Sequence, residues 1–371
     1  MGRRRKKWCW VAAPVLGACL LAGVTPAEAR QLSDVDEVAG GLGGPSGLSV
    51  RNHRILVAES DANRITMIDA HTGQTSVETA DVPGPTGVTR VGRKTVVIVT
   101  GEAGGPPDAP QPDPLPEGGS SVYVGRVGKH KRVLADLLAY ELANNTDGQT
   151  QFGPDGKPLD SLSNPFAVIE DRSHDGFVIV ADAGANAVLR VSRDGQVSPL
   201  FVPPVINTGA CEGRDNNDPA HTGCDPVPTG LAYGPDGYLY VSGLSSLVPG
   251  EGRVYVVNVH TGALVRTIDK LNPATGVTVG RDGSVYVSEL LFGAAGGEGP
   301  PPPGFDPSQI GRIVRVAPDG TRTAAQVTMP IGLSIQHGKL YSTSWAIAGQ
   351  MGMPGRGQVV LVKPTAFEPL Q

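Results

Sequence analysis

A Pro-x-Gly motif recurs along this chain, and it constrains the fold more than any other feature. Six copies read GPSGL at Pro45, GPTGV at Pro85, NPFAV at Pro165, VPTGL at Pro228, NPATGV with Gly276 and MPIGL at Pro330. Each copy is followed by two alternating, β-rich runs such as YLYVSG and RVYVVNV, and Asp-Gly or His-Thr-Gly turns precede the first run or follow the second in several units. This pattern is typical of antiparallel strands. Five of the six units continue into a weaker fourth run, and repeated four-stranded units predict the blades of a β-propeller.

The two ends of the repeat predict how the ring closes. The sixth unit ends after QVVLVKP, one strand short, while residues 33–40 (SDVDEVAG) form a strand without a blade of its own. We therefore expect this N-terminal strand to become the outer strand of the last blade. The predicted fold class is all-β, with a single six-bladed β-propeller domain over residues 30–371. The Pro-x-Gly motif would mark the crowded inner strand, where a small residue lets backbones approach closely.

Residues 1–29 have the features of a Sec signal peptide. Five basic residues, Arg3 to Lys7, precede an apolar stretch over residues 8–24, and small residues at Ala27 and Ala29 suit a signal peptidase. We expect cleavage between Ala29 and Arg30, and a secreted or extracytoplasmic protein. No later apolar run is long enough to cross a bilayer, so the mature chain is predicted to lack a transmembrane segment.

Charge and cysteine content limit the partners and the compartment. Without residues 1–29, the 31 basic and 36 acidic residues of the chain become 26 and 35, a net charge of −9. Such an acidic chain without basic blocks argues against nucleic acid as a partner. Two cysteines remain, Cys211 and Cys224, and in an oxidising compartment they are expected to form a disulfide.

Long loops are expected on one face of the propeller only. The turns after first and third strands are short, as in SHDG and HTG, whereas all long insertions follow second strands or connect blades. Six of the seven histidines fall in the short turns, and His221 is the exception. Loops grafted on one side of a rigid scaffold commonly carry function. We therefore expect a binding site on the loop-bearing face.

Three carboxylates and one tryptophan are the candidate ligand-binding residues. Glu59, Asp182 and Glu289 end the second strands of alternate blades, which suggests a cation or polar-ligand site near the mouth of the channel. The alternative is that each acid accepts hydrogen bonds from its own turn. Trp345 lies with Leu244, Leu247, Phe292, Met351 and Met353 in or beside the long loops. These apolar residues either form a ligand pocket or partner patch, or hold down their own loops.

Signatures of catalysis and metal binding are missing from the sequence. It contains no Gly-x-Ser-x-Gly elbow, no cysteine nucleophile with a histidine and no zinc-binding spacing. We therefore expect no catalytic residue and no resident cofactor or metal. The Asp/Asn-rich loop between the cysteines is a candidate calcium ligand, although its spacing matches no EF-hand. One amphipathic stretch, DLLAYELANN from Asp136, predicts a helix.

The chain resembles the ScyD/ScyE family of exported propellers, relatives of NHL-repeat and TolB-like proteins. The resemblance covers the mature chain and is most specific in ADLLAYELANN, NPFAVIEDRSHDGFVIVADAGANAVLRVSRDGQV and PTGLAYGPDGYLYVSG. It implies a six-bladed exported propeller and supplies no catalytic residues. The related gluconolactonases place a metal-binding Asn inside a Pro-Asn-Gly-Leu motif. In this chain that slot holds Ser46, Thr86, Phe166, Thr229, Thr275 and Ile331, which disfavours a metal lactonase.

Three functional hypotheses follow from these features. The first is a secreted, non-catalytic module that binds a small molecule or an extracellular protein through the loop-bearing face. The alternative is an enzyme acting on a small metabolite at the channel mouth, with Glu59, Asp182 and Glu289 as its polar groups. The third is a purely structural envelope protein.

Overall fold

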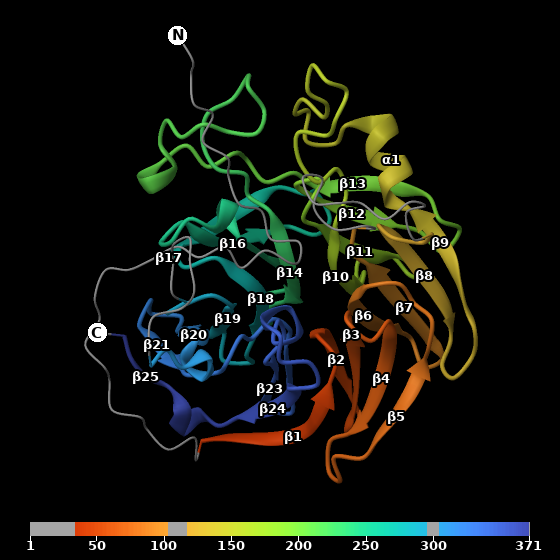
Figure 1. Ribbon diagram of the computed structural model, residues 1–371, viewed down its shortest axis with the longest axis vertical. Coiled ribbons are helices and arrows are strands. Elements are labelled where there is room, and N and C mark those ends of the chain that lie inside the picture. The colour runs from red at the N-terminus through yellow and green to blue at the C-terminus, as the bar shows by residue number, and fades with distance from the viewer. Residues whose placement is uncertain (1–33, 103–116, 295–303, 371) are drawn as a thin grey trace.

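The computed structural model describes residues 34–102, 117–294 and 304–370. The signal peptide expected over residues 1–29 and parts of two long loops lie outside these ranges. Six antiparallel sheets are arranged in a ring, as Figure 1 shows, so the predicted six-bladed β-propeller is confirmed. Within the described ranges, no helix is long and apolar enough to cross a membrane.

The first three blades follow one another along the chain. Blade 1 consists of β2 (Pro45–Arg51), β3 (Arg54–Glu59), β4 (Arg64–Asp69) and β5 (Thr75–Thr79). Blade 2 consists of β6 (Pro85–Val91), β7 (Thr95–Thr100), β8 (Ser121–Arg126) and β9 (Lys131–Asp136). Blade 3 consists of β10 (Pro165–Glu170), β11 (Val178–Asp182), β12 (Ala187–Val191) and β13 (Val197–Phe201). The predicted helix is confirmed as α1 (Leu137–Asn144), which begins after the N-cap Asp136.

The last three blades include both ends of the described chain. Blade 4 consists of β14 (Pro228–Tyr233), β15 (Leu239–Gly243), β16 (Gly252–Val257) and β17 (Leu264–Leu271). Blade 5 consists of β18 (Ala274–Val279), β19 (Val285–Glu289), β20 (Arg312–Val316), β21 (Arg322–Ala325) and β25 (Glu368–Pro369). Blade 6 consists of β22 (Leu333–Gln336), β23 (Lys339–Ser344), β24 (Gly357–Val362) and β1 (Val35–Leu42).

The N-terminal strand closes the ring, as the sequence predicts. β1 pairs antiparallel with β24, with Val35 opposite Val362 and Leu42 opposite Gly357. The strand lies two residues further along the chain than the expected range of 33–40. The sequence did not indicate β25, which adds to the outer edge of blade 5 by pairing with β21.

The hydrophobic core lies between neighbouring blades. Strand residues alternate, so that each sheet presents apolar side chains to the blades on both of its sides. Between blades 3 and 4, for example, Ile179 and Val188 belong to one buried cluster with Val241. The clusters between blades follow from the valine-rich alternation of the repeats.

The recurring motif serves the contact between inner strands. A Cβ atom on Gly47 would lie 2.6 Å from the carbonyl oxygen of Thr86, and one on Gly230 would lie 2.9 Å from the Cα atom of Gly276. A larger residue would therefore force neighbouring blades apart, as the sequence analysis expects. Hydroxyl groups at the middle position of the motif donate to the first or second residue of the next blade's motif. These bonds are Ser46 to Pro85, Thr86 to Pro165, Thr229 to Ala274 and Thr275 to Pro330, at 2.7–3.2 Å.

Candidate functional site

A cavity of about 420 Å³ occupies the mouth of the central channel on the loop-bearing face. Residues at the start of inner strands line its deep part, among them Ser46, Thr86 and Thr275. Every blade also contributes residues that directly follow its second strand. These residues are Ser60, Asp61, Gly101, Glu102, Ala183, Gly184, Leu244, Leu290, Leu291 and Ala346. The cavity therefore lies on the face where the sequence predicts the site.

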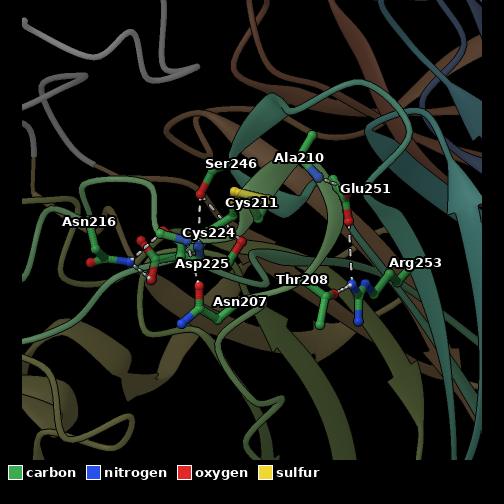
Figure 2. The surroundings of a disulfide bond; sticks show 12 residues. Asn207, Thr208, Ala210, Cys211, Asn216, Cys224, Asp225, Ser246, Glu251 and Arg253 are labelled. Carbon is green, nitrogen blue, oxygen red and sulfur yellow. Dashed lines mark hydrogen bonds and ion pairs between the residues drawn. A yellow bond between two sulfur atoms is a disulfide. The ribbon is translucent and has the colours of Figure 1, made fainter.

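The loop between blades 3 and 4 forms one wall, and a disulfide holds it. Cys211 and Cys224 are bonded as predicted, with their Cα atoms 5.4 Å apart. Figure 2 shows the polar contacts around this bond. The Asp225 carboxylate accepts a hydrogen bond from the Asn216 amide at 3.0 Å, and the Asp225 backbone N–H donates to Ser246 Oγ at 2.8 Å. Cys224, Asp225 and Asn216 all line the cavity.

Glu102 is a cavity acid that ionises near neutral pH. Burial is the main cause that raises its pKa to about 7, and the charge of Asp182 also raises it. The hydrogen bond from Ser161 Oγ acts in the opposite direction and lowers the pKa. Ser161 donates to Glu102 Oε2 at 2.9 Å, and the Glu102 backbone N–H donates to Asn164 Oδ1 at 3.2 Å. A carboxyl group in this environment can gain or lose a proton under physiological conditions.

Two further acids lie close to each other in the cavity wall. Burial raises the pKa of Asp160 well above its usual range, and the charges of Asp225 and Glu102 raise it further. Burial also raises the pKa of Asp225, although the amides of Asn216 and Gln149 donate to it. The protonation of Asp160 is therefore linked to the charges of both Asp225 and Glu102.

The three carboxylates expected at the mouth are not among the lining residues. Glu59 is fully buried, where it accepts hydrogen bonds from the Gly43 backbone at 2.7 Å and from Arg64 Nε at 2.8 Å. Glu289 likewise accepts from the Asn272 backbone at 2.8 Å and from Arg312 Nε at 2.6 Å. In each of these two blades, the acid is hydrogen-bonded to the segment that precedes the first strand of the same blade, β2 for Glu59 and β18 for Glu289. The structure does not bring these acids together.

Asp182 lies directly behind the cavity wall. It accepts hydrogen bonds from the Asn164 backbone at 2.6 Å, from Ser163 Oγ at 2.7 Å and from the backbone of its own turn. Burial raises its pKa to about 6. Because Asn164 lines the cavity and bonds to Glu102, Asp182 holds a residue that positions the cavity acid.

Trp345 supports the opposite, apolar side of the cavity. Its side chain is 9% exposed and belongs to a cluster with Leu290 and Ile331, both of which line the cavity. The Arg356 guanidinium lies 4.3 Å from the centre of the indole ring. Of the other expected apolar residues, Leu244 and Leu247 line the cavity. Phe292 instead stacks against Arg312 at 3.5 Å.

Sequence reasoning missed Glu102 and Asp160. Glu102 lies two residues beyond β7, which ends at Thr100, whereas Glu59, Asp182 and Glu289 are the last residues of their strands, so a search of strand ends passes over it. Asp160 lies in a long connection without strand or helix periodicity. Only the folded arrangement places it beside Asp225.

No histidine is among the described residues that line the cavity. His53, His71 and His337 lie together on the opposite face, with the His53 ring centre 4.2 Å from that of His71 and 6.2 Å from that of His337. In the part of the chain that the structure describes, no group of three or more His, Cys, Asp or Glu side chains is arranged to hold a metal ion.

No protein-family model matches the sequence, and no curated protein matches it. Among solved structures, the chain is similar to a gluconolactonase from Xanthomonas campestris, at 13% identity over 96% of this chain and 99% of that one, with a TM-score of 0.53. A luciferin-regenerating enzyme is 10% identical over 91% of this chain and 97% of that one, with a TM-score of 0.54. Virginiamycin B lyase from Staphylococcus aureus is 13% identical over 88% and 85%, with a TM-score of 0.47. At these identities the likeness shows the six-bladed fold alone.

Proposed function

We propose that this chain is a secreted binding protein that holds a small organic molecule in the cavity of its loop-bearing face. The observation that carries this proposal is the cavity itself. Its volume of about 420 Å³ lies within the range of small-molecule sites, and all six blades contribute to its lining. Binding in this proposal does not alter the ligand.

The distribution of apolar residues favours a small molecule over a protein partner. Leu244 and Leu290 line the cavity and are less than 10% exposed, so their apolar surface is concave and sheltered. Large apolar side chains that are exposed in the described ranges are spread over several elements, such as Val77 in β5, Leu142 in α1 and Leu264 in β17. A protein interface would gather such residues into one patch.

Export and family membership belong to the same proposal. The basic and apolar residues 1–29 support a Sec signal peptide, and the disulfide suits an oxidising compartment. The mature domain would then span residues 30–371. We propose that it belongs to the ScyD/ScyE family on the quoted stretches, of which PTGLAYGPDGYLYVSG covers β14 and β15 and ends directly before the cavity residue Leu244.

Binding of an uncharged apolar dye tests the site. The mature protein should increase the fluorescence of N-phenylnaphthylamine saturably, with one dye bound per chain. Leu291→Trp should abolish this signal because the larger side chain fills the cavity that Leu291 lines. The matched control is Leu142→Trp, since Leu142 is 48% exposed and lies outside the cavity. Equal binding by both variants, or no saturable binding by the unmodified protein, would refute the proposed site.

An enzyme is the second candidate function. The raised pKa of Glu102, about 7, favours it because a carboxyl group that titrates near neutrality can act as a general acid or base. Mass spectrometry of the compounds recovered from the protein distinguishes an enzyme from a binding protein. A changed product that forms with the unmodified protein and not with Glu102→Gln would establish the enzyme. Recovery of unchanged ligand from both proteins supports the binding protein.

A further inference from the structure

The described lining of the cavity is acidic. Five of its residues are carboxylic acids, whereas no Lys, Arg or His is present among the described residues that line it. The acids are Asp61, Glu102, Asp160, Asp215 and Asp225. A cavity of this composition attracts cations and repels anions.

The acids and the apolar residues occupy different parts of the ring. The acids come from blades 1 and 2 and from the connections on either side of blade 3. Apolar side chains come mainly from blades 4 to 6, where Leu247, Leu291 and Ile347 line the cavity. A ligand that fills the cavity therefore meets carboxyl groups on one side and hydrocarbon on the other.

The cavity acids have only uncharged hydrogen-bond donors within the described part of the chain. Glu102 accepts from the Ser161 hydroxyl, and Asp225 accepts from the amides of Gln149 and Asn216. None of the described ion pairs includes a cavity acid. A carboxylate removed from water without a cation costs free energy, which a bound cation would recover.

Asp160 also has an uncharged donor in the same wall. Asn217 lines the cavity, and its side-chain amide donates a hydrogen bond to Asp160 that lowers the pKa of this carboxyl against the effect of burial. The carboxyl groups of the wall are therefore held by amides and hydroxyls, and no fixed cation neutralises them in the described part of the chain.

We propose that the cavity selects cationic amphiphiles, in which one ammonium or guanidinium group is joined to an apolar body. The cationic group lies among Glu102, Asp160 and Asp225, and the apolar body packs against the leucines of blades 4 and 5. This inference rests on the proposed function, because it names the ligand class of the same cavity.

Three probes of matched shape test the ligand class. Phenylbutylamine, phenylbutanol and phenylbutyrate share one apolar body and carry a cation, an uncharged hydroxyl and an anion. Isothermal titration calorimetry of the mature protein should give the amine about tenfold tighter binding than the alcohol, the scale expected for one charge-assisted contact, and no binding of the acid. Equal affinity for amine and alcohol, or binding of phenylbutyrate, would overturn the cation preference and leave the cavity as a site. Binding of none of the probes would count against the cavity itself, and so against both proposals.

Substitutions separate the charged side from the apolar side. Glu102→Gln and Asp160→Asn should each weaken amine binding about fivefold or more and leave alcohol binding unchanged, since only the charge is removed. The matched control is Asp175→Asn, because Asp175 is fully exposed and does not line the cavity. Leu291→Ala should weaken the binding of phenylbutylamine and of phenylbutanol to the same extent, because both carry the same apolar body. Amine affinity that is unchanged in both acid variants would overturn the proposed position of the cation.

Discussion

Glu102 connects ligand binding to pH at the scale of a single residue. Its pKa is about 7, and the pKa values of Asp160 and Asp225 are also raised by burial. Protonation therefore removes negative charge from the cavity as the pH falls through neutrality. Other acids also act on these three, namely Asp182 behind the wall and Asp147 and Asp218 beside Asp225.

The affinity for phenylbutylamine should therefore rise with pH. A cation binds best to ionised carboxylates, and the amine itself stays protonated from about pH 5.5 to about pH 8, so its affinity should increase about tenfold over this range. Calorimetry in two buffers of different ionisation enthalpy should show proton release on binding. Phenylbutanol provides the control because its affinity should stay constant. An amine affinity that is independent of pH would contradict the raised pKa values.

At the scale of one element, the disulfide-bonded loop is both a stabilising link and a wall of the site. The bond joins residues 13 positions apart, and closing a loop of this length contributes about 3 kcal/mol. Cys211→Ala combined with Cys224→Ala should lower the free energy of unfolding by about this amount. Because Cys224 and Asp225 line the cavity, the double variant should also bind N-phenylnaphthylamine more weakly than the unmodified protein.

A reductant provides the internal control for this element. It should reproduce the loss of dye binding in the unmodified protein and have no effect on the double variant. If the double variant binds the dye with unchanged affinity, the loop keeps its position without the disulfide, and its role is limited to stability.

The whole molecule depends on one strand that comes from the far end of the chain. β1 covers the edge of β24, and its residues Ala39 and Leu42 pack in a cluster with Ile55 and Val57 of blade 1. Deleting residues 30–42 should abolish the single cooperative unfolding transition and make the chain sensitive to proteolysis, because both an edge and a core surface are uncovered.

A peptide added in trans provides the complementary measurement. A synthetic peptide of residues 34–43 should bind the deleted protein by strand addition and restore its resistance to proteolysis. Truncation before Glu368 is the control because it removes β25, a two-residue edge strand that is exposed. A deleted protein that unfolds as cooperatively as the intact one would show that the ring does not depend on closure by β1.

The features that the sequence predicts are those carried by the repeat. The number of blades, the closing strand and the face that carries the long loops and the cavity follow from strand periodicity and loop placement. The approach of inner strands follows from the glycines of the motif. The grouping of Glu102, Asp160 and Asp225 could not be predicted, because long loops without periodicity bring two of these acids together. The repeated positions of Glu59 and Glu289 reflect structural bonds to the start of each blade. That Glu59 and Glu289 bind a cation or a polar ligand stays a prediction.

Ring closure also determines the order in which this protein can fold. Asp36 of β1 and Lys363, the residue after β24, form an ion pair across 327 residues of sequence. Synthesis begins at the N-terminus, so β1 is among the first strands made and must wait unpaired until nearly the whole chain exists. Contacts of such long sequence separation form slowly. The exposed acids Asp36 and Glu37 make the waiting strand a poor template for aggregation, and the pairing of β1 with β24 is expected to be the last step of folding.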